Sequence, residues 1–341
     1  MPSFGFFEPI IIFTLLNVTM ALGLYITALS GQLSMATAAI AGVGGYLSGV
    51  LTVKFGVPFI PSVAAAAAAG CLVGATLAAL TAKMRDFILK LTTLAFGEAL
   101  SVLAFNWDYI GGANSFTGLR LETGIGTSVV AMLIAFYVAW RFDGSRLGFA
   151  ARAVRDDPLA AAAMGVPVAT IRIVTFALGG TVVGMGGAVQ AHYVLVISPS
   201  DLGFFVSLNY IIFLLFGGLQ TIWGPILGAV LLTVLPEALR FANEFRLIIY
   251  GLIIVAVVLW RPDGLLWRRP TTTPRLPSGT RRKERRPPDR AAVAELPLNE
   301  PVLGVRETAL AVNAAGAQSA DMLNTSFVAR DSQRGVEPGS R

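Results

Sequence analysis

The chain has 341 residues, of which 55% are hydrophobic and only 13% are charged. Soluble domains carry about 25% charged residues, so this composition excludes most soluble enzymes and fully disordered chains. It indicates a polytopic membrane protein. The net charge of +6 does not indicate nucleic-acid binding, because 14 of the 26 Lys and Arg residues lie in residues 261–341. With one cysteine, Cys71, and one histidine, His192, no internal disulfide is possible and no metal site is predicted.

Stretches long enough to cross a membrane, about 20 mostly apolar residues each, follow one another along the first 260 residues. The seventh stretch is short and is expected to be tilted or broken. We predict an all-α polytopic membrane protein with about nine transmembrane helices, within a range of eight to ten. The stretches cover residues 7–29, 32–53, 61–82, 87–105, 124–140, 171–191, 206–219, 222–241 and 245–260.

The distribution of basic residues predicts the orientation of the spans. If the C-terminus is cytoplasmic, the loops at 83–90 and 141–172 are cytoplasmic too, and they carry eight of the 12 Lys and Arg residues before residue 261. We therefore predict an N-terminus outside and a cytoplasmic C-terminal tail. The expected domains are a transmembrane domain over 1–262 and a basic, Pro-rich, disordered tail over 263–341.

The longest loop of the transmembrane domain, about 142–170, is amphipathic and predicts a short helix. Asp156 and Asp157 precede Pro158, as at the start of a helix, and Gly165 suits its end. Two interpretations stay open: a solvated connector, or a docking helix for a cytoplasmic partner. The loop on the other side at 106–122 is interpreted as a structured cap over the helix ends rather than as a substrate contact.

Small residues inside the spans predict close packing between helices, because lipid provides no hydrophobic drive for association. The GxxxG spacing occurs four times, on four different spans, and predicts a tightly packed bundle. A translocation path between such helices is compatible with it. The pairs are Gly45 and Gly49, Gly70 and Gly74, Gly180 and Gly184, and Gly224 and Gly228.

Polar residues within the spans are the candidates for lining a translocation path: Asn17, Gln32, Ser34 and Glu98. Glu98 is the one acid deep inside a predicted span, where a charge costs roughly 3 kcal/mol unless it faces protein or water. A structural contact with another helix explains it equally well. A proton-coupled carrier usually needs a second carboxylate at similar depth, and none is found. His192 is interpreted as an interfacial residue.

Soluble catalytic motifs are absent: the chain has no HExxH, CxxC or GxSxG pattern. It also has no Gly-Lys pair and hence no nucleotide-binding phosphate loop. We therefore expect a protein that is not an enzyme and binds no cofactor. If transport uses ATP and Mg²⁺, another chain must bind them.

Several segments in order resemble the permease subunits of branched-chain amino acid ABC transporters, of the LivM type. The resemblance spans about 250 residues, and its motifs are individually degenerate. They are LLNVTMALGLYITALSGQLSMATAAIAGVGGYLS at 15–48, LTTLAFGEAL at 91–100, GGANSFTGL at 111–119, LGFAARAVRDDPLAAAAMGVPV at 147–168, ISPSDLGFFVSLNYIIFLLFGGLQTIWGPILGAVLLTVLPEALR at 197–240 and GLIIVAVVLWRPDGLL at 251–266.

What the resemblance implies is a type II-like importer bundle in a bacterial inner membrane. It would pair with a second permease, most simply as a heterodimer, with two cytoplasmic ATPases and with a periplasmic or lipid-anchored substrate-binding protein. The 142–170 loop would be the coupling segment that seats on an ATPase. Its implied coupling residues are Arg152, Arg155, Asp156, Asp157, Ala160, Ala161 and Gly165.

The resemblance has limits. Leu159 stands where the wider EAA-type motif of importers has Glu, and Thr37 stands where the family commonly has His, so a role of that His does not transfer. The 263–341 tail also departs from the family. The implied substrates are branched-chain or related hydrophobic amino acids. Urea, short amides or small aromatic acids stay open as alternatives, as do a secondary transporter and a membrane scaffold.

Overall fold

The computed structural model describes residues 4–82, 84, 86–240, 245–260 and 264–265, and these residues are helical with no strand. The all-α prediction is confirmed. An isolated bridge joins Phe116 and Ile197. The long helices are α1 (Phe4–Ala28), α2 (Thr37–Val53), α3 (Phe59–Thr81), α4 (Asp86–Phe105), α5 (Ile125–Asp143), α8 (Val168–Val194), α9 (Phe204–Gly217), α10 (Trp223–Ala238) and α11 (Arg246–Trp260); the shorter ones are α6 (Arg146–Asp156) and α7 (Pro158–Ala163), with 3₁₀ turns at Asp108–Ile110, Gly112–Asn114 and Pro199–Leu202.

Each of the nine predicted stretches overlaps one of the nine long helices. Five of these, α1, α3, α4, α5 and α8, are long and apolar enough to cross a membrane, whereas the others are shorter. The number of spans therefore stays a prediction. The largest difference is in the second stretch, where α2 begins at Thr37 rather than at residue 32 and leaves a buried turn before it. The predicted tail lies outside the described residues, apart from 264–265.

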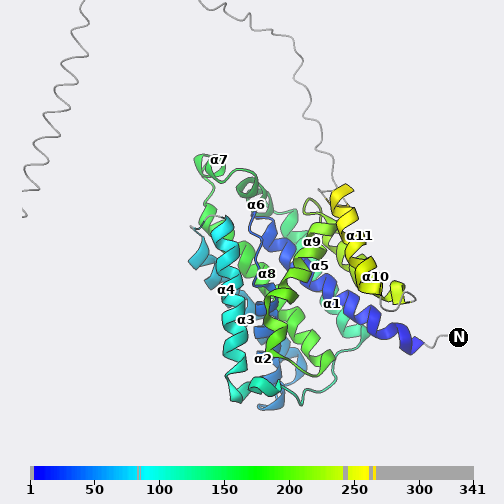
Figure 1. Cartoon of the computed structure of the whole chain (residues 1–341). Helices are drawn as coiled ribbons and strands as arrows, with labels where there is room; N and C mark the ends of the chain where they lie inside the picture. Colours follow the sequence, from blue (N-terminus) through cyan, green and yellow to red (C-terminus); the bar gives the residue numbers. More distant parts are fainter. Residues whose placement is uncertain (1–3, 83, 85, 241–244, 261–263, 266–341) are drawn as a thin grey trace, which may run out of the picture. The chain divides into compact units, whose positions relative to one another are not determined.

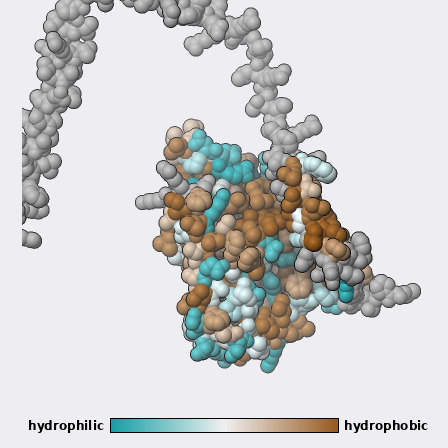
Figure 2. Space-filling model, viewed as in Figure 1, coloured by the Kyte–Doolittle hydropathy of each residue, from teal (hydrophilic) through white to brown (hydrophobic). Residues whose placement is uncertain are grey.

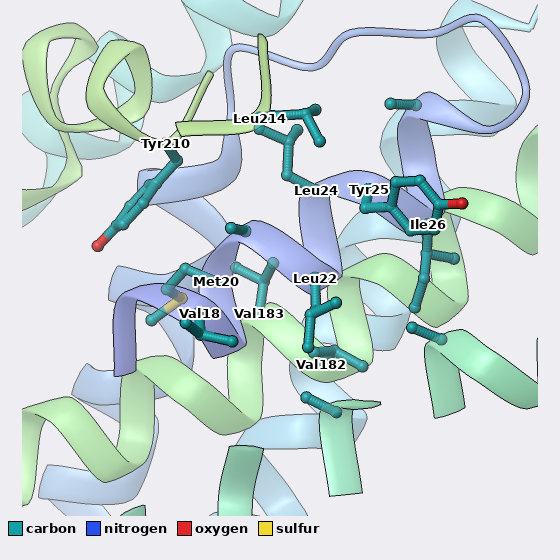
Figure 3. Packing of buried hydrophobic residues seen from close by; sticks show 14 of the residues in the cluster. Val18, Met20, Leu22, Leu24, Tyr25, Ile26, Val182, Val183, Tyr210 and Leu214 are labelled. Atoms are coloured by element: carbon teal, nitrogen blue, oxygen red, sulfur yellow. The ribbon is translucent and has the colours of Figure 1, made fainter. Parts of the chain in front are cut away.

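Helix α8 lies at the centre of the bundle, packed against α1, α2 and α3 (Figure 1). Helix α1 is apolar on all sides and is largely buried, as expected for a helix inside a core. Its side chains meet those of α8 and α9 in the main hydrophobic cluster (Figure 3). The labelled residues of that view are Val18, Met20, Leu22, Leu24, Tyr25 and Ile26 of α1, Val182 and Val183 of α8, and Tyr210 and Leu214 of α9.

Glycines bring the backbones of α3 and α8 into direct contact. A Cβ added at Gly70 would collide with the carbonyl oxygen of Gly180, and one at Gly180 would collide with that of Gly70. A Cβ added at Gly184 would lie 2.6 Å from the carbonyl oxygen of Ala66 of α3. Gly74 approaches the backbone of α8 one turn further along. This interface leaves no room for any side chain larger than hydrogen at these positions.

The remaining predicted glycines lie at other helix interfaces. A Cβ at Gly45 would lie 3.3 Å from a carbonyl oxygen of α8, and one at Gly49 would lie 2.9 Å from the ring of Phe116. Gly224 and Gly228 of α10 face the last turn of α9 and the residue after it. The four pairs thus lie at three contacts: α3 with α8, α2 with α8 and with Phe116, and α9 with α10.

Helix α9 begins part-way along the bundle. The segment 195–203 leaves α8 and returns alongside α2, since Ile197 packs near Gly49 and Leu202 packs near Gly42. Helix α9 then starts at Phe204 and has 14 residues, which at 1.5 Å per residue is roughly 21 Å, less than the roughly 30 Å hydrocarbon core of a bilayer. Irregular backbone at such depth requires protein or water around it.

The bundle has two ends and a partly apolar side. We call the end that carries α6 and α7 the α6–α7 end, and the end at which α2 and α8 finish the opposite end. Figure 2 shows hydrophobic residues over α10 and α11 and hydrophilic residues near the α6–α7 end. The exposed apolar side chains of α11 include Ile248, Leu252 and Val255. This surface suits lipid or another membrane-embedded chain.

Candidate functional site

The predicted short helix after Asp157 is α7, and the loop holds a second helix, α6, which was not predicted. The Ser145 hydroxyl accepts a hydrogen bond from the Gly148 amide at 3.1 Å and caps α6. The Asp157 carboxylate caps α7 by accepting from the Leu159 and Ala160 amides at 2.9 and 3.0 Å. Gly165 follows α7 with a φ of +83°, a conformation that glycine adopts without strain.

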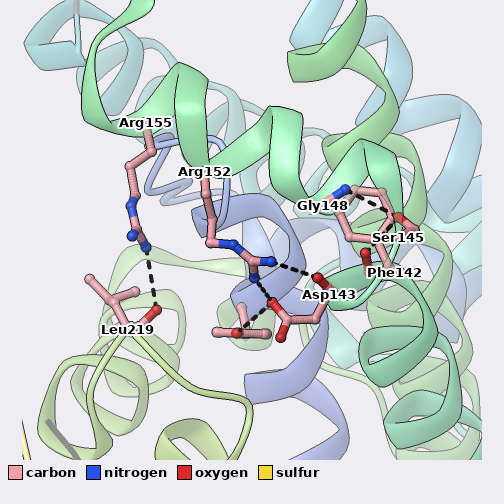
Figure 4. Close-up of polar contacts among 8 residues, drawn as sticks. Phe142, Asp143, Ser145, Gly148, Arg152, Arg155 and Leu219 are labelled. Atoms are coloured by element: carbon pink, nitrogen blue, oxygen red, sulfur yellow. Dashed lines mark hydrogen bonds and ion pairs between the residues drawn. The ribbon is translucent and has the colours of Figure 1, made fainter. Parts of the chain in front are cut away.

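Arg152 ties α6 to α5 and α1 (Figure 4). Its guanidinium forms an ion pair with the Asp143 carboxylate at the end of α5 and donates to the Asp143 backbone oxygen at 2.8 Å. The Tyr25 hydroxyl of α1 donates to the same carboxylate at 3.1 Å. Because the Arg152 and Asp143 side chains are only 25% and 27% exposed, this contact is screened less than a surface ion pair.

Arg155 extends the contact of α6 to two turns of the chain. Its guanidinium donates to the backbone oxygen of Leu219, in the turn between α9 and α10, at 3.4 Å (Figure 4). Its Cα lies against Gly31, in the turn between α1 and α2. Asp156, beside it, is exposed and lies 3.5 Å from the Arg155 Nε. Helix α6 is therefore linked to helices α1 and α5 and to two turns, the one between α1 and α2 and the one between α9 and α10.

Helix α7 presents its apolar side chains to the outside. Leu159 is 83% exposed and Met164 is 85% exposed, with Ala160 and Gly165 beside them. Ala161 is buried against the bundle, so it does not lie on the surface that a partner could meet. The predicted coupling residues thus divide into an inward set, Arg152, Arg155 and Ala161, and an outward set, Asp156, Asp157, Ala160 and Gly165. A cavity of about 980 Å³ lies beside the inward set, between α5, α6 and the turn before α10.

Of the predicted path residues, Gln32 and Ser34 lie in the turn before α2, whereas Asn17 lies within α1 and Glu98 within α4. The Asn17 amide donates to Thr233 of α10 at 3.0 Å, and the Ser34 hydroxyl accepts from the Ala36 amide at 3.1 Å. Gln32 is buried in the turn before α2, and its side-chain amide has no hydrogen-bond partner among the described residues. Asn17 and Ser34 therefore have structural partners, and of these three side chains Gln32 alone keeps its hydrogen-bonding capacity unused.

Of the two interpretations of Glu98, a functional charge or a structural contact, the structure gives the carboxylate a structural contact. Its side chain is exposed at the surface of this chain, and its carboxylate accepts from the Phe204 amide at 2.7 Å. It therefore caps the start of α9, where a negative charge also meets the positive end of the helix. A contact between distant segments of the chain, which the sequence does not reveal, explains this carboxylate.

Substitutions at Glu98 separate the cap from the charge. We expect Glu98→Ala to lower the stability of the purified chain by about 1 kcal/mol, because the Phe204 amide loses its acceptor. Glu98→Gln keeps an acceptor oxygen and should lose only about 0.5 kcal/mol, the contribution of the helix dipole. Thermal unfolding in detergent measures both. Equal losses in the two variants would show that the cap is not what Glu98 contributes.

His192 lies two residues before the end of α8 and is fully buried within the chain. Its Nε2 lies 3.0 Å from the Ser48 hydroxyl of α2, which in turn lies 3.0 Å from the Ser62 hydroxyl of α3. Its Nδ1 lies 3.3 Å from the backbone oxygen of Arg120. The histidine thus joins α8 to α2 and to the loop before α5. In the sequence, only the presence of a serine on each of two neighbouring spans, Ser48 and Ser62, could have indicated a polar contact with His192.

Comparison with known proteins gives the family. Residues 6–258 match the family model described as branched-chain amino acid transport system / permease component. The chain is similar to the high-affinity branched-chain amino acid transport system permease protein LivM of Escherichia coli (strain K12), 27% identical over 77% of this chain and 70% of that protein. It is similar to LivM of Salmonella typhimurium, 25% identical over the same shares.

A shorter similarity reaches a different permease of the same system. The permease protein LivH of Salmonella typhimurium is 26% identical over 48% of this chain and 54% of that protein. No solved structure matches. Since the family model covers most of the chain, including all the helices described except the ends of α1 and α11, the chain belongs to the family of permease components of branched-chain amino acid transport systems.

Proposed function

We propose that the chain is a membrane-spanning subunit of an ATP-driven ABC importer for branched-chain or related hydrophobic amino acids. The observation that carries the proposal is the two-sided α6–α7 element. Its outward side offers Leu159 and Met164, and its inward side holds α1, α5 and the α9–α10 turn. An element built in this way can receive movement from a partner and pass it to the bundle. The names of the relatives support the substrate class.

The proposed partners follow from the same element and from the relatives. Salmonella typhimurium has two permease proteins, LivM and LivH, both named as parts of a branched-chain amino acid transport system. This supports pairing of the present chain with a second permease. Two cytoplasmic ATPases would seat on the α6–α7 ends, and a substrate-binding protein would deliver the amino acid at the opposite end. In this arrangement the α6–α7 end faces the cytoplasm of the inner membrane.

The proposed mechanism is a shift between two populations of the bundle. ATP, held with Mg²⁺ by the partner ATPases, brings those subunits together and moves α7. Arg152 and Arg155 carry the movement into α5 and into the turns at Gly31 and Leu219. The bundle then changes between inward-open and outward-open states. The permease contributes binding surfaces and rigid contacts and carries out no covalent step.

A substitution at the tip of α7 tests the proposal. We expect Met164→Arg to reduce amino acid uptake about fivefold in vesicles holding the whole transporter. The side chain is exposed, and a cation at the C-terminal end of a helix favours the helix by about 0.5 kcal/mol, so α7 should stay folded. The measurements are uptake of radiolabelled leucine and ATP hydrolysis in the same vesicles. Hydrolysis should no longer respond to the substrate.

Met164→Leu is the matched control for this test, because it keeps an apolar side chain of similar volume at the same place. It should behave as the unmodified chain. The proposed docking surface is wrong if Met164→Arg transports and hydrolyses ATP as well as Met164→Leu does. The proposed importer is wrong if the unmodified transporter takes up leucine at the same rate with and without ATP.

A further inference from the structure

A cavity of about 250 Å³ lies between α2, α8 and the segment 195–203. Two of its walls consist of small residues, among them Gly42, Gly45, Gly187 and Ala191. Three polar side chains also line it: Gln190 of α8, Asp201 of the returning segment and Tyr210 of α9. The volume lies just below the roughly 300–1,000 Å³ of pockets for drug-sized ligands, so it suits a smaller molecule.

Asp201 is a carboxylate without a basic partner. Its Oδ2 accepts from the Ser198 amide at 2.9 Å, and the ion pairs among the described residues do not include it. It is exposed, yet its neighbour Leu202 packs against Gly42, well inside the length of α2. A carboxylate at such depth costs about 3 kcal/mol against lipid, so it must meet water or a cation.

The other two polar groups have complementary chemistry. The Gln190 amide donates a hydrogen bond to the Tyr210 hydroxyl, which leaves the Tyr210 O–H and the second N–H of Gln190 to donate to a carboxylate. The cavity therefore offers an acceptor for a cationic group, donors for an anionic group and a wall of small residues for an apolar group. A hydrophobic amino acid in its zwitterionic form has these three parts.

We propose that this cavity binds the transported amino acid, with its ammonium group on Asp201, its carboxylate on Tyr210 and Gln190, and its aliphatic side chain against the α2–α8 wall. The proposal rests on the proposed function and adds a site within the permease itself. It also favours amino acids over urea, which carries no charge, and over small aromatic acids that lack an ammonium group.

Direct binding of radiolabelled L-leucine to the purified permease–ATPase complex, without the binding protein, tests the site. Asp201→Asn keeps an oxygen for the Ser198 amide, so the local turn is retained and only the charge is lost. We expect this variant to bind leucine about tenfold more weakly, and Asp201→Glu to recover part of the loss. Glu122→Gln, which removes an exposed acid outside the cavity, should bind within twofold of the unmodified complex.

A competitor without the ammonium group sharpens the test. In the unmodified complex, 4-methylpentanoate should compete with leucine poorly, and in Asp201→Asn it should compete about as well as leucine itself. Unchanged leucine binding in Asp201→Asn, in a complex that still imports leucine, overturns this site and leaves the proposed function standing. Failure of the unmodified transporter to import leucine at all overturns the proposed function instead.

Discussion

Replacing Gly180 with leucine is expected to prevent α3 and α8 from packing, and no folded chain should be recovered. The carbonyl oxygen of Gly70 occupies the place of any Cβ at this position, and Gly74 lies close behind it. Both obstacles are backbone atoms of another helix, which cannot turn aside as a side chain can. Overpacking usually costs about 1–3 kcal/mol, and a clash between two backbones should exceed that range, a large part of a typical total stability.

Size-exclusion chromatography of the fluorescently tagged chain in detergent measures this effect, as the loss of the monodisperse peak. Gly251→Leu in α11 is the control, since nothing lies within 4 Å of a Cβ at that position. It should give an unchanged peak. A folded Gly180→Leu chain with an unchanged melting temperature would show that α3 and α8 do not pack as described.

Reversing the charge of Arg152 is expected to uncouple the α6–α7 element from the bundle. Arg152→Glu places a second carboxylate against Asp143 in a site where both side chains are about three-quarters buried. The lost pair and the new repulsion together should disfavour the docked position of α6 by about 3 kcal/mol. That corresponds to a change of about 100-fold in the population of the docked state. Leucine uptake by the whole transporter should fall by a similar factor.

A double-substitution cycle separates this contact from general damage. If Arg152 and Asp143 act through each other, Arg152→Gln combined with Asp143→Asn should reduce uptake no more than the worse of the two alone. Arg240→Gln is the control, because Arg240 forms an exposed ion pair with Glu237 at 3.0 Å, of a kind that contributes at most about 1 kcal/mol. Additive losses at Arg152 and Asp143 would rule out the proposed transmission through their pair.

Hydropathy alone located the long helices, because burial in a membrane and burial in this bundle select the same apolar residues. It could not distinguish α1, which is surrounded by protein, from α11, whose side chains are exposed. It located the start of α9 to within two residues of Phe204, but not the place part-way along the bundle at which that helix begins. The residues that make 195–203 turn back, Leu195 at a φ of +65° and the capped turn before Phe204, are set by contacts with distant helices.

Of the α6–α7 element, the sequence predicted only the features that depend on neighbouring residues in the chain. The sequence around Asp157 and Pro158 indicates a helix start, and the structure has one there. The inward role of Arg152 depends on Asp143 and Tyr25, which approach it only after α1 and α5 have packed. Asp201 attracts no notice in the sequence, since a short turn with Ser198 is a sufficient reason for it. Its significance comes from the cavity beside it.

The short length of α9 has an electrical consequence. In the proposed importer, water would reach the exposed Asp201 carboxylate and the cavity beside it along 195–203, from the opposite end down to the level of Phe204. Water of high dielectric constant carries little of a membrane voltage, so most of the voltage falls between Phe204 and the α6–α7 end. A unit charge gains about 2.3 kcal/mol per 100 mV only in crossing that remaining layer. In that arrangement solutes would reach the depth of Asp201 almost without sensing the voltage, and the insulating part of the protein would be the layer that α9 spans.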